Sequence, residues 1–325
     1  MASLTEHRPI PSAEQLLAGF VPPPHFDGAS FDSYLPQDPT QAHALADLRA
    51  FADGLGRPRR RSLLRRPAPP TLGRYLDGGF GVGKTHLLAA LWRAIDVPAA
   101  FGTFVGYTNL VGALGFSNVV DALEQFRLIC IDEFELDDPG DTVMMSSLCS
   151  RLVERGVVFA ATSNTLPDQL GEGRFAADEF MREIQGLASH FAVLRIDGED
   201  YRHLNVVAHV QSKPAEAVRQ AIAEIPGATV DDLDVVLAHL ATVHPSGYRE
   251  MLRGIPAVGL LNLHTLHDQN QALRLVVLVD RMYDLDIAVH TQGVSLRELF
   301  APEMLAGGYR KKYYRALSRL AALHA

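Results

Sequence analysis

One stretch of the chain has the residue types and the spacing of a phosphate-binding loop. Residues 78–85 fit the pattern G-x-x-x-x-G-K-[ST]. The eight residues are Gly78, Gly79, Phe80, Gly81, Val82, Gly83, Lys84 and Thr85. The glycines allow positive φ, so that backbone N–H groups can close around phosphate oxygens. We expect Lys84 to reach the β- and γ-phosphates and the Thr85 hydroxyl to bind Mg²⁺, and we include His86 in the nucleotide-binding segment.

The segments on either side of this loop supply the elements that must position it. Residues 74–77 are typical of the end of a short strand, and residues 86–92 contain helix formers without a breaker. The N-terminus of such a helix carries a partial positive charge that favours phosphate. A strand, a glycine loop and a helix in this order favour a nucleotide site over a glycine-rich turn that matches by chance.

Polar residues follow two strongly apolar segments further along the chain. Residues 128–131 predict a strand buried on both faces, which ends at Asp132 and Glu133. Residues 157–162 predict another such strand, which is followed by Asn164. Ligands in parallel sheets bind at the carboxyl ends of the strands. We therefore expect these polar side chains to lie at the same sheet edge as the phosphate loop.

This set of side chains fits hydrolysis of ATP by water. Asp132 is placed to hold the Mg²⁺ shell, and Glu133 can orient and polarise the attacking water. Asn164 can hydrogen-bond the same water or the γ-phosphate, while Lys84 contributes charge. Taken alone, Asp132-Glu133 could be an ordinary turn after a strand, but the phosphate loop upstream favours catalysis. A small-molecule kinase is disfavoured because it lacks a water-activating glutamate and must shield the phosphate from water.

Three residues outside these segments are weaker candidates. Arg174 lies in a loop after Asn164 and could reach a neighbouring subunit's γ-phosphate as an arginine finger. Arg274 lies near the start of a helix in the C-terminal region and could touch the nucleotide from a lid. A surface salt bridge is the alternative for either arginine. By fold analogy, Gln41 is a candidate contact to the adenine.

Composition narrows the class of protein. The chain of 325 residues is 47% hydrophobic and 21% charged, which is ordinary for a globular protein. A net charge of −8 argues against a bulk nucleic-acid binder. Cys130 and Cys149 have no metal-site spacing and are best interpreted as small apolar residues in a reducing compartment. No apolar run reaches the length of a membrane span and residues 1–20 have no signal pattern, so we expect a cytoplasmic protein.

The phosphate loop and the polar strand ends resemble those of the ZapE family of AAA+ ATPases, which includes bacterial cell-division ATPases and mitochondrial relatives. The matching stretches begin at about residue 75 and continue to the end of the chain. They include Tyr75–Leu88, Cys130–Phe134, Gly156–Pro167, Arg174-Phe175, Gly198–Arg202, Ile255-Pro256, Arg274–Asp284 and Ser318–Leu320. The order of the DEF, TSN-x-x-P, DYR and VD-x-x-YD elements is more specific than GKT or DE. Two departures are His86-Leu87, where the family often has methionines, and the short Gly171–Gly173 segment before Arg174.

The resemblance implies ATP hydrolysis with Mg²⁺, sensor roles for Asn164 and Arg274, and Arg174 as the finger. Bacterial members act with the tubulin-like division ring protein at the membrane, and mitochondrial relatives are implicated in protein quality control. We therefore expect ATP-dependent homo-oligomerisation and action on a protein of the division machinery, with at most peripheral membrane association. A nucleic-acid loader and a quality-control ATPase stay open as alternatives. The basic loop within residues 57–70 is the only support for nucleic acid, and a solvated linker is its ordinary interpretation.

The expected fold class is α/β, with a P-loop doubly wound parallel sheet of the AAA+ type. We expect residues 1–56 to form a strap and a helix packed on the ATPase core, with a capping box at Ser12 and Gln15 opening a short helix. The core itself is expected to span residues 71–202, after the basic loop. Residues 203–325 are expected to form a smaller, mostly helical lid region with short strands, in which Thr229 is a candidate helix cap.

Overall fold

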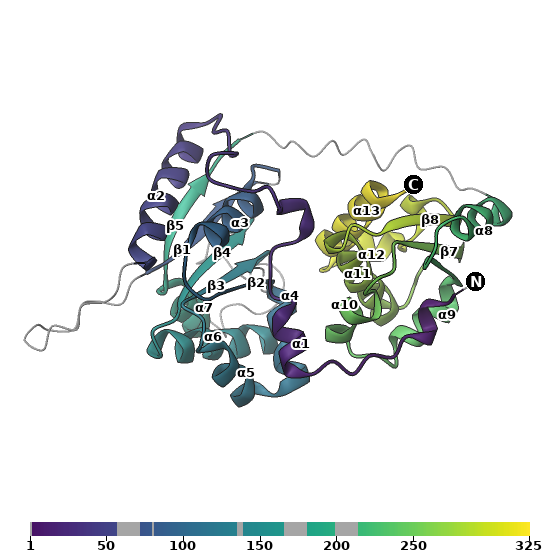
Figure 1. Cartoon of the computed structure of the whole chain (residues 1–325), viewed down its shortest axis with the longest axis horizontal. Coiled ribbons are helices and arrows are strands. Elements are labelled where there is room, and N and C mark those ends of the chain that lie inside the picture. Colours follow the sequence, from purple (N-terminus) through teal and green to yellow (C-terminus); the bar gives the residue numbers. More distant parts are fainter. Residues whose placement is uncertain (1, 57–71, 80, 135–138, 166–180, 199–213) are drawn as a thin grey trace, which may run out of the picture. The chain divides into compact units, whose positions relative to one another are not determined.

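The computed structural model describes residues 2–56, 72–79, 81–134, 139–165, 181–198 and 214–325 (Figure 1). Two compact units divide the chain. The P-loop unit contains Phe20–Pro22 and Phe26–Arg202, and the C-terminal unit contains Met1–Gly19, Pro23–His25 and His203–Ala325. Each unit is an α/β structure with its own parallel sheet.

The P-loop unit is built on a five-stranded parallel sheet with the order β2-β3-β4-β1-β5. The strands are β1 Gly73–Gly78, β2 Ala99–Thr103, β3 Leu128–Asp132, β4 Val158–Ser163 and β5 Phe191–Ile196. β2, β3 and β4 lie on one side of β1 in this order, and β5 lies on the other side. The strand order therefore reverses at β1. Ligands of open α/β sheets bind at such a switch point, at the carboxyl ends of the strands. This confirms the predicted doubly wound parallel fold.

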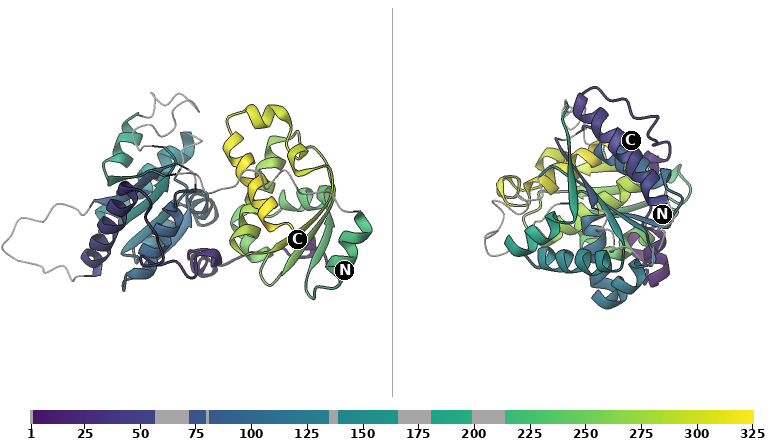
Figure 2. Two further views of the ribbon diagram at one scale, coloured as in Figure 1. Left: turned by 90° about the horizontal axis from the view of Figure 1, so that it is seen from above. Right: turned by 90° about the vertical axis from the view of Figure 1, so that its left-hand side faces the viewer.

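Helices cover both faces of this sheet (Figure 1 and Figure 2). They are α2 Pro39–Gly56, α3 Lys84–Ala94, α4 Phe104–Leu114, α5 Phe116–Leu123, α6 Pro139–Glu154 and α7 Met181–Ala188. One core joins α2 and α3 to strand residues such as Leu76, Leu128 and Leu194. On the other face Tyr75 begins an aromatic cluster described below. Successive residues of a strand point to opposite faces, so Tyr75 and Leu76 belong to different cores.

The C-terminal unit has a three-stranded parallel sheet with the order β6-β7-β8. The strands are β6 Thr229–Asp232, β7 Ala257–Leu263 and β8 Ala288–Gly293. The helices of at least four residues are α1 Ala13–Ala18, α8 Ala215–Ala223, α9 Leu233–Leu240, α10 Tyr248–Met251, α11 Gln269–Asp284, α12 Pro302–Ala306 and α13 Arg310–Leu323. The main core joins α9, α11 and α13 to β7 and β8, and a smaller cluster packs α8 against β7. Residues 204–210, whose alternating pattern predicts a strand, lie outside the described residues.

The structure contains one of the two helix caps that the sequence predicted. The capping box is present, since the Ser12 hydroxyl accepts from the Gln15 N–H at 3.2 Å and the Gln15 side chain accepts from the Ser12 N–H at 2.8 Å. The prediction of Thr229 as a cap was wrong. Thr229 begins β6, and the side chain of Asp232 accepts from the Asp234 N–H to cap α9. A short strand pairs residues 229–232 with β7 before the helix can begin.

The first nineteen residues differ from the expectation that residues 1–56 all pack on the ATPase core, because they group with the C-terminal unit. Ala2 forms a parallel bridge with Thr229 at the edge of β6. Leu4 is fully buried in the main core of that unit, and its N–H donates to the Asp231 carboxylate at 2.8 Å. The His239 ring nitrogen lies 2.9 Å from the His7 carbonyl. These contacts bridge more than 220 residues of sequence, so no local pattern could indicate them.

An ion-pair network joins α11 to α13. The Asp280 side chain, of which 16% is exposed, pairs with Arg315 at 2.8 Å and with Arg319. Burial alone would raise the pKa of Asp280, but the two guanidinium groups outweigh it and hold the pKa below its ordinary value. The Arg319 guanidinium also lies 5.0 Å from the centre of the Tyr283 ring. The family motifs around Asp280 and Arg319 therefore meet in space as one structural unit.

No helix in the described parts of the chain is long and apolar enough to cross a membrane. The longest of these helices, α2, has 18 residues, among which are two aspartates and one arginine.

Candidate nucleotide site

The phosphate loop lies between β1 and α3 at the carboxyl edge of the sheet. Gly81 and Gly83 have φ of 75° and 84°, in the left-handed region that glycine adopts without strain. Gly78 is required for a different reason, since a Cβ there would lie 2.0 Å from the Ile196 carbonyl oxygen of β5. The sequence therefore forms this loop because its glycines permit both the turn and the close contact with the neighbouring strand.

Lys84 and Asn164 are brought together at the start of α3. The Lys84 ammonium donates to the Asn164 side-chain oxygen at 2.9 Å, to the Gly78 carbonyl at 2.9 Å and to the Gly79 carbonyl at 2.5 Å. Only 9% of Lys84 is exposed, which keeps its charge close to the loop. The two side chains expected to face the γ-phosphate, one from α3 and one from the end of β4, are thus neighbours.

The hydroxyl of Thr85 and the carboxylate of Asp132 form a second contact at the same edge. The Thr85 hydroxyl donates to the two Asp132 oxygens at 3.1 and 3.2 Å. Asp132 is 6% exposed. Within the described ranges, no group of three or more His, Cys, Asp or Glu side chains could hold a metal ion. A hydroxyl beside one carboxylate nevertheless fits Mg²⁺, which takes oxygen ligands and obtains the remaining ones from phosphates and waters.

Thr162 is a residue that the sequence reasoning missed. It is 2% exposed and lies on β4. Its hydroxyl donates to Asp132 at 2.5 Å and accepts from the Glu133 N–H at 3.0 Å. One hydroxyl therefore fixes both the carboxylate expected to hold Mg²⁺ and the backbone of the expected catalytic glutamate. The only available signal was the family element that contains Thr162 immediately before Ser163-Asn164.

Glu133 occupies an uncommon backbone conformation. Its φ is 54°, in the left-handed region, which costs energy for a residue with a side chain. The next residue, Phe134, donates its N–H to the Thr162 carbonyl at 2.7 Å. The Phe134 ring is fully buried at 5.2 Å from Phe104 and 6.1 Å from Tyr75, in edge-to-face contacts. Strain at such a position is typical of functional sites, and the buried phenylalanine holds the turn in place.

A strap, defined as residues 26–35, contacts the phosphate loop from the N-terminal side. The Tyr34 hydroxyl donates to the Val82 carbonyl at 3.0 Å. The His86 ring nitrogen Nε2 lies 3.0 Å from the Ser33 hydroxyl and 3.2 Å from the Ser30 carbonyl. The side chain of His86 thus contacts the strap. The Tyr34 contact joins positions 48 residues apart, so no local pattern of the sequence indicates it.

The remaining candidates lie outside the described residues or in the other unit. Phe80 and Arg174 lie outside the described residues, as do Tyr201 and Arg202. Arg274 lies on α11 of the C-terminal unit.

Gln41 has a structural contact where an adenine contact was expected. Its amide nitrogen donates to the Asp197 carbonyl at 2.8 Å, and its oxygen accepts from the Gln37 N–H at 2.8 Å. Both ends of the amide therefore join α2 to the end of β5 and to the preceding turn.

Charges near the loop are arranged in pairs. The buried Asp77, at the end of β1, accepts from Arg195 at 2.5 Å, and Arg195 also donates to Asp197 at 2.7 Å. These hydrogen bonds, that with Asp197 first and that with Asp77 next, raise the pKa of Arg195.

Burial raises the pKa of the Cys149 thiol to about 12 and that of the Cys130 thiol well above its ordinary value. Both cysteines are therefore protonated apolar residues, which agrees with their interpretation from sequence.

Comparison with known proteins gives the family. The chain matches the AFG1-like ATPase family over residues 11–218 and 208–325. The chain belongs to the AFG1-like ATPase family. This places it among the P-loop ATPases, in agreement with the expected resemblance.

Individual relatives are more distant. Cell division protein ZapE of Escherichia coli K12 is 28% identical over 145 residues, which cover 41% of this chain and 39% of that protein. Lactation elevated protein 1 homolog B of Danio rerio is 26% identical over 161 residues, covering 42% and 32%. The matches thus span less than two fifths of these relatives' lengths. The crystal structure of DnaI is 18% identical with a TM-score of 0.44, covering 55% of this chain and 94% of that one, and adds nothing to the family assignment.

Thr162→Val is expected to lower the ATPase rate by about 10–100-fold, the usual cost of losing a residue that orients a metal ligand. Valine keeps the shape of threonine but removes the hydroxyl that connects Asp132 with Glu133. Phosphate release measured against Mg²⁺ concentration should show a higher Mg²⁺ requirement as well as a lower maximal rate. Thr162→Ser keeps the hydroxyl and should restore most of both. Equal Mg²⁺ curves for the parent and Thr162→Val would show that the hydroxyl has no positioning role.

Proposed function

We propose that this family member hydrolyses ATP at the phosphate loop with Mg²⁺, and that the cycle drives its action on a protein partner of the division machinery. The observation that carries the catalytic part is the convergence of Lys84, Asn164, Thr85 and Asp132 at one sheet edge. Mg²⁺ bound by Thr85 and Asp132 would neutralise charge on the phosphates.

The chain's own residues divide the remaining work. The loop backbone and Lys84 bind the phosphates, and Asn164, within hydrogen-bond distance of Lys84, orients the γ-phosphate or the water. Glu133 polarises the attacking water and accepts its proton as the oxygen attacks phosphorus. Thr162 holds the Glu133 backbone in position. Because transfer to water is mainly positioning and charge stabilisation, these roles supply most of what hydrolysis requires.

Two arginines and an oligomer complete the proposal. Arg174 is proposed as the finger that enters a neighbouring subunit's site, and Arg274 as the sensor on the C-terminal unit. A guanidinium suits both roles because it presents several donors to phosphate oxygens. The resemblance supports these assignments, and they make the cycle dependent on homo-oligomer formation. We further propose a cytoplasmic location, since the described helices include no candidate membrane span.

The catalytic part is tested by phosphate release from ATP with and without Mg²⁺. Lys84→Ala is expected to lower the rate by about 10²–10³-fold, because it removes a donor to the transferring group. Arg151→Ala removes a positive charge from the exposed surface of α6 in the same unit and should leave the rate unchanged. Undiminished release from Lys84→Ala would place hydrolysis elsewhere.

The choice of a division partner is supported by the name of the E. coli relative, a cell division protein. The test is cosedimentation of the ATP-bound Glu133→Gln variant with polymers of the tubulin-like division protein. Parallel samples contain single-stranded DNA or an unfolded protein. Retention by the polymers alone supports the proposal. Salt-dependent binding to DNA would favour the nucleic-acid loader, and preference for the unfolded protein would favour quality control.

A further inference from the structure

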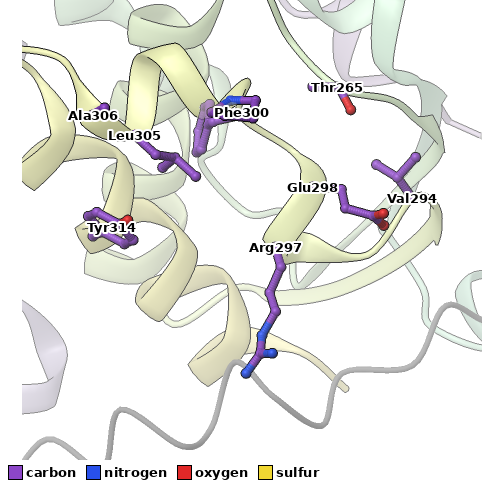
Figure 3. Close-up of a pocket in the computed structure, with 9 residues that line it drawn as sticks. Thr265, Val294, Arg297, Glu298, Phe300, Leu305, Ala306 and Tyr314 are labelled. Atoms are coloured by element: carbon purple, nitrogen blue, oxygen red, sulfur yellow. The ribbon is translucent and has the colours of Figure 1, made fainter.

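The C-terminal unit has a pocket of about 530 Å³ near the carboxyl ends of its strands (Figure 3). Thr265 follows β7 by two residues and Val294 directly follows β8, and both line the pocket. Leu305 of α12 and Tyr314 of α13 contribute from the opposite side, as Figure 3 shows. Crevices at the carboxyl ends of parallel strands are the usual ligand sites of open α/β sheets, and this volume lies in the usual range for ligand pockets.

The lining is aliphatic and aromatic over most of its surface. Five apolar residues contribute to it, namely Val294, Phe300, Pro302, Leu305 and Ala306. Phe300 is buried, with 1% exposed, whereas Tyr314 is an exposed aromatic residue with 55% exposed. An exposed tyrosine beside an apolar pocket resembles the centre of a protein interface, where aromatic residues and arginine are enriched.

The charged residues of the lining are Arg297 and Glu298. The Glu298 carboxylate already accepts from the Ser295 N–H at 3.2 Å and hydroxyl at 2.8 Å, in a capping box. In the part of the chain that the structure describes, the exposed Arg297 has no hydrogen bond or ion pair. Arg297 is thus the cation of the lining that stays available to a ligand, since the Glu298 carboxylate already has donors within the chain.

We propose that this pocket binds a segment of a protein partner that presents an apolar side chain next to a carboxylate. The apolar side chain would lie between Leu305 and Tyr314, and the carboxylate would pair with Arg297, which can donate two parallel hydrogen bonds to its oxygens. The lining has one exposed aromatic residue, Tyr314, whereas grooves for single strands stack successive bases on several aromatic side chains, so a leucine or phenylalanine side chain fits this pocket better. The inference gives the proposed function a docking site for its protein partner.

The test uses full-length protein and two fluorescent nine-residue peptides. The probe has a central phenylalanine flanked by two glutamates on each side, and the comparison peptide has lysines in place of the glutamates. We expect anisotropy to show binding of the acidic probe only. Arg297→Glu should weaken it by about tenfold or more, the size of a charged hydrogen bond. Arg219→Glu makes the same charge change on the exposed surface of α8, in the same unit, and should bind the probe like the parent.

A second variant tests the apolar part without disturbing the core. Ala306 is exposed at the pocket, so the arginine of Ala306→Arg should fill the pocket and weaken binding of the acidic probe. The rate of phosphate release should stay unchanged. Equal binding of the two peptides, equal binding by Arg297→Glu and the parent, or no binding of the acidic probe would overturn the proposal. So would preferential binding of a fluorescent oligothymidine that Arg297→Glu abolishes. Because binding is measured without turnover, its failure is distinguishable from a failure of ATP hydrolysis.

Discussion

Glu133→Gln is expected to bind ATP normally and to release phosphate about 10²–10⁴ times more slowly, the usual contribution of a positioned base. Glutamine has nearly the same shape, so the turn that Phe134 and Thr162 hold should persist. The amide cannot take a proton from water. Binding of ATP uses Lys84, Thr85 and the loop backbone, none of which changes.

Two measurements separate binding from hydrolysis in this variant. Equilibrium binding of a fluorescent ATP analogue should match the parent, while the single-turnover rate of phosphate release should fall. Glu124→Gln is the matched control, because it makes the same change at an exposed carboxylate that pairs with Arg155. A Glu133→Gln rate close to the parent's would assign the base to another residue, and a loss of ATP binding would show that Glu133 supports the loop itself.

Asp280→Asn is expected to destabilise the C-terminal unit by about 3–5 kcal/mol, the usual cost of breaking a buried ion pair from one side. Arg315 and Arg319 are 18% and 15% exposed, so both charges would lose their counter-ion in a largely dry environment. Hydrogen exchange of the amides in α11 and α13, measured by mass spectrometry, reports on this unit separately from the P-loop unit.

The ion pair of Asp280 also makes the stability of the C-terminal unit depend on pH. Because the pKa of Asp280 is lower in the folded state, the pair stabilises the fold above the ordinary carboxyl pKa and loses this contribution as pH falls through the folded value. Protection in α11 of the parent should therefore fall towards that of Asp280→Asn at acid pH. Asp286→Asn, at a carboxylate with 69% exposed, should change stability by no more than about 0.5 kcal/mol. Similar losses in both variants would show that the network contributes little.

Contiguous sequence motifs were sufficient to predict that the phosphate loop, Asp132 and Asn164 lie at one edge of the sheet. The phosphate loop and the apolar runs before Asp132 and Asn164 are each local, and parallel strand topology then places their ends at one sheet edge. The position of Thr162 beside Asp132 depends on register. Ile131 pairs with Ala161, so the next residues along both strands are neighbours. A sequence does not reveal register between two fully apolar strands, since they show no alternation that would distinguish one alignment from another.

Contacts between distant segments explain the other differences. Leu4 is one apolar residue among polar neighbours, so only the finished core of the C-terminal unit shows why it is buried. Tyr34 is buried in the core of the P-loop unit, but its hydrogen bond to Val82 requires the assembled loop. The motif around Asp280 was identified by resemblance, whereas its partners are on a helix some 35 residues later. Such pairings follow from tertiary packing, which local propensity does not contain.

The docking of residues 2–7 against β6 has a consequence for the order of folding during synthesis. Their binding surface includes Thr229, Asp231 and His239, which the ribosome adds more than 220 residues later. All five strands of the P-loop sheet precede that surface in the chain, and domains generally fold as units as they emerge. Leu4 therefore stays exposed to solvent or to chaperones after the P-loop sheet has folded. It is buried only when the residues of the C-terminal core that surround it have been made.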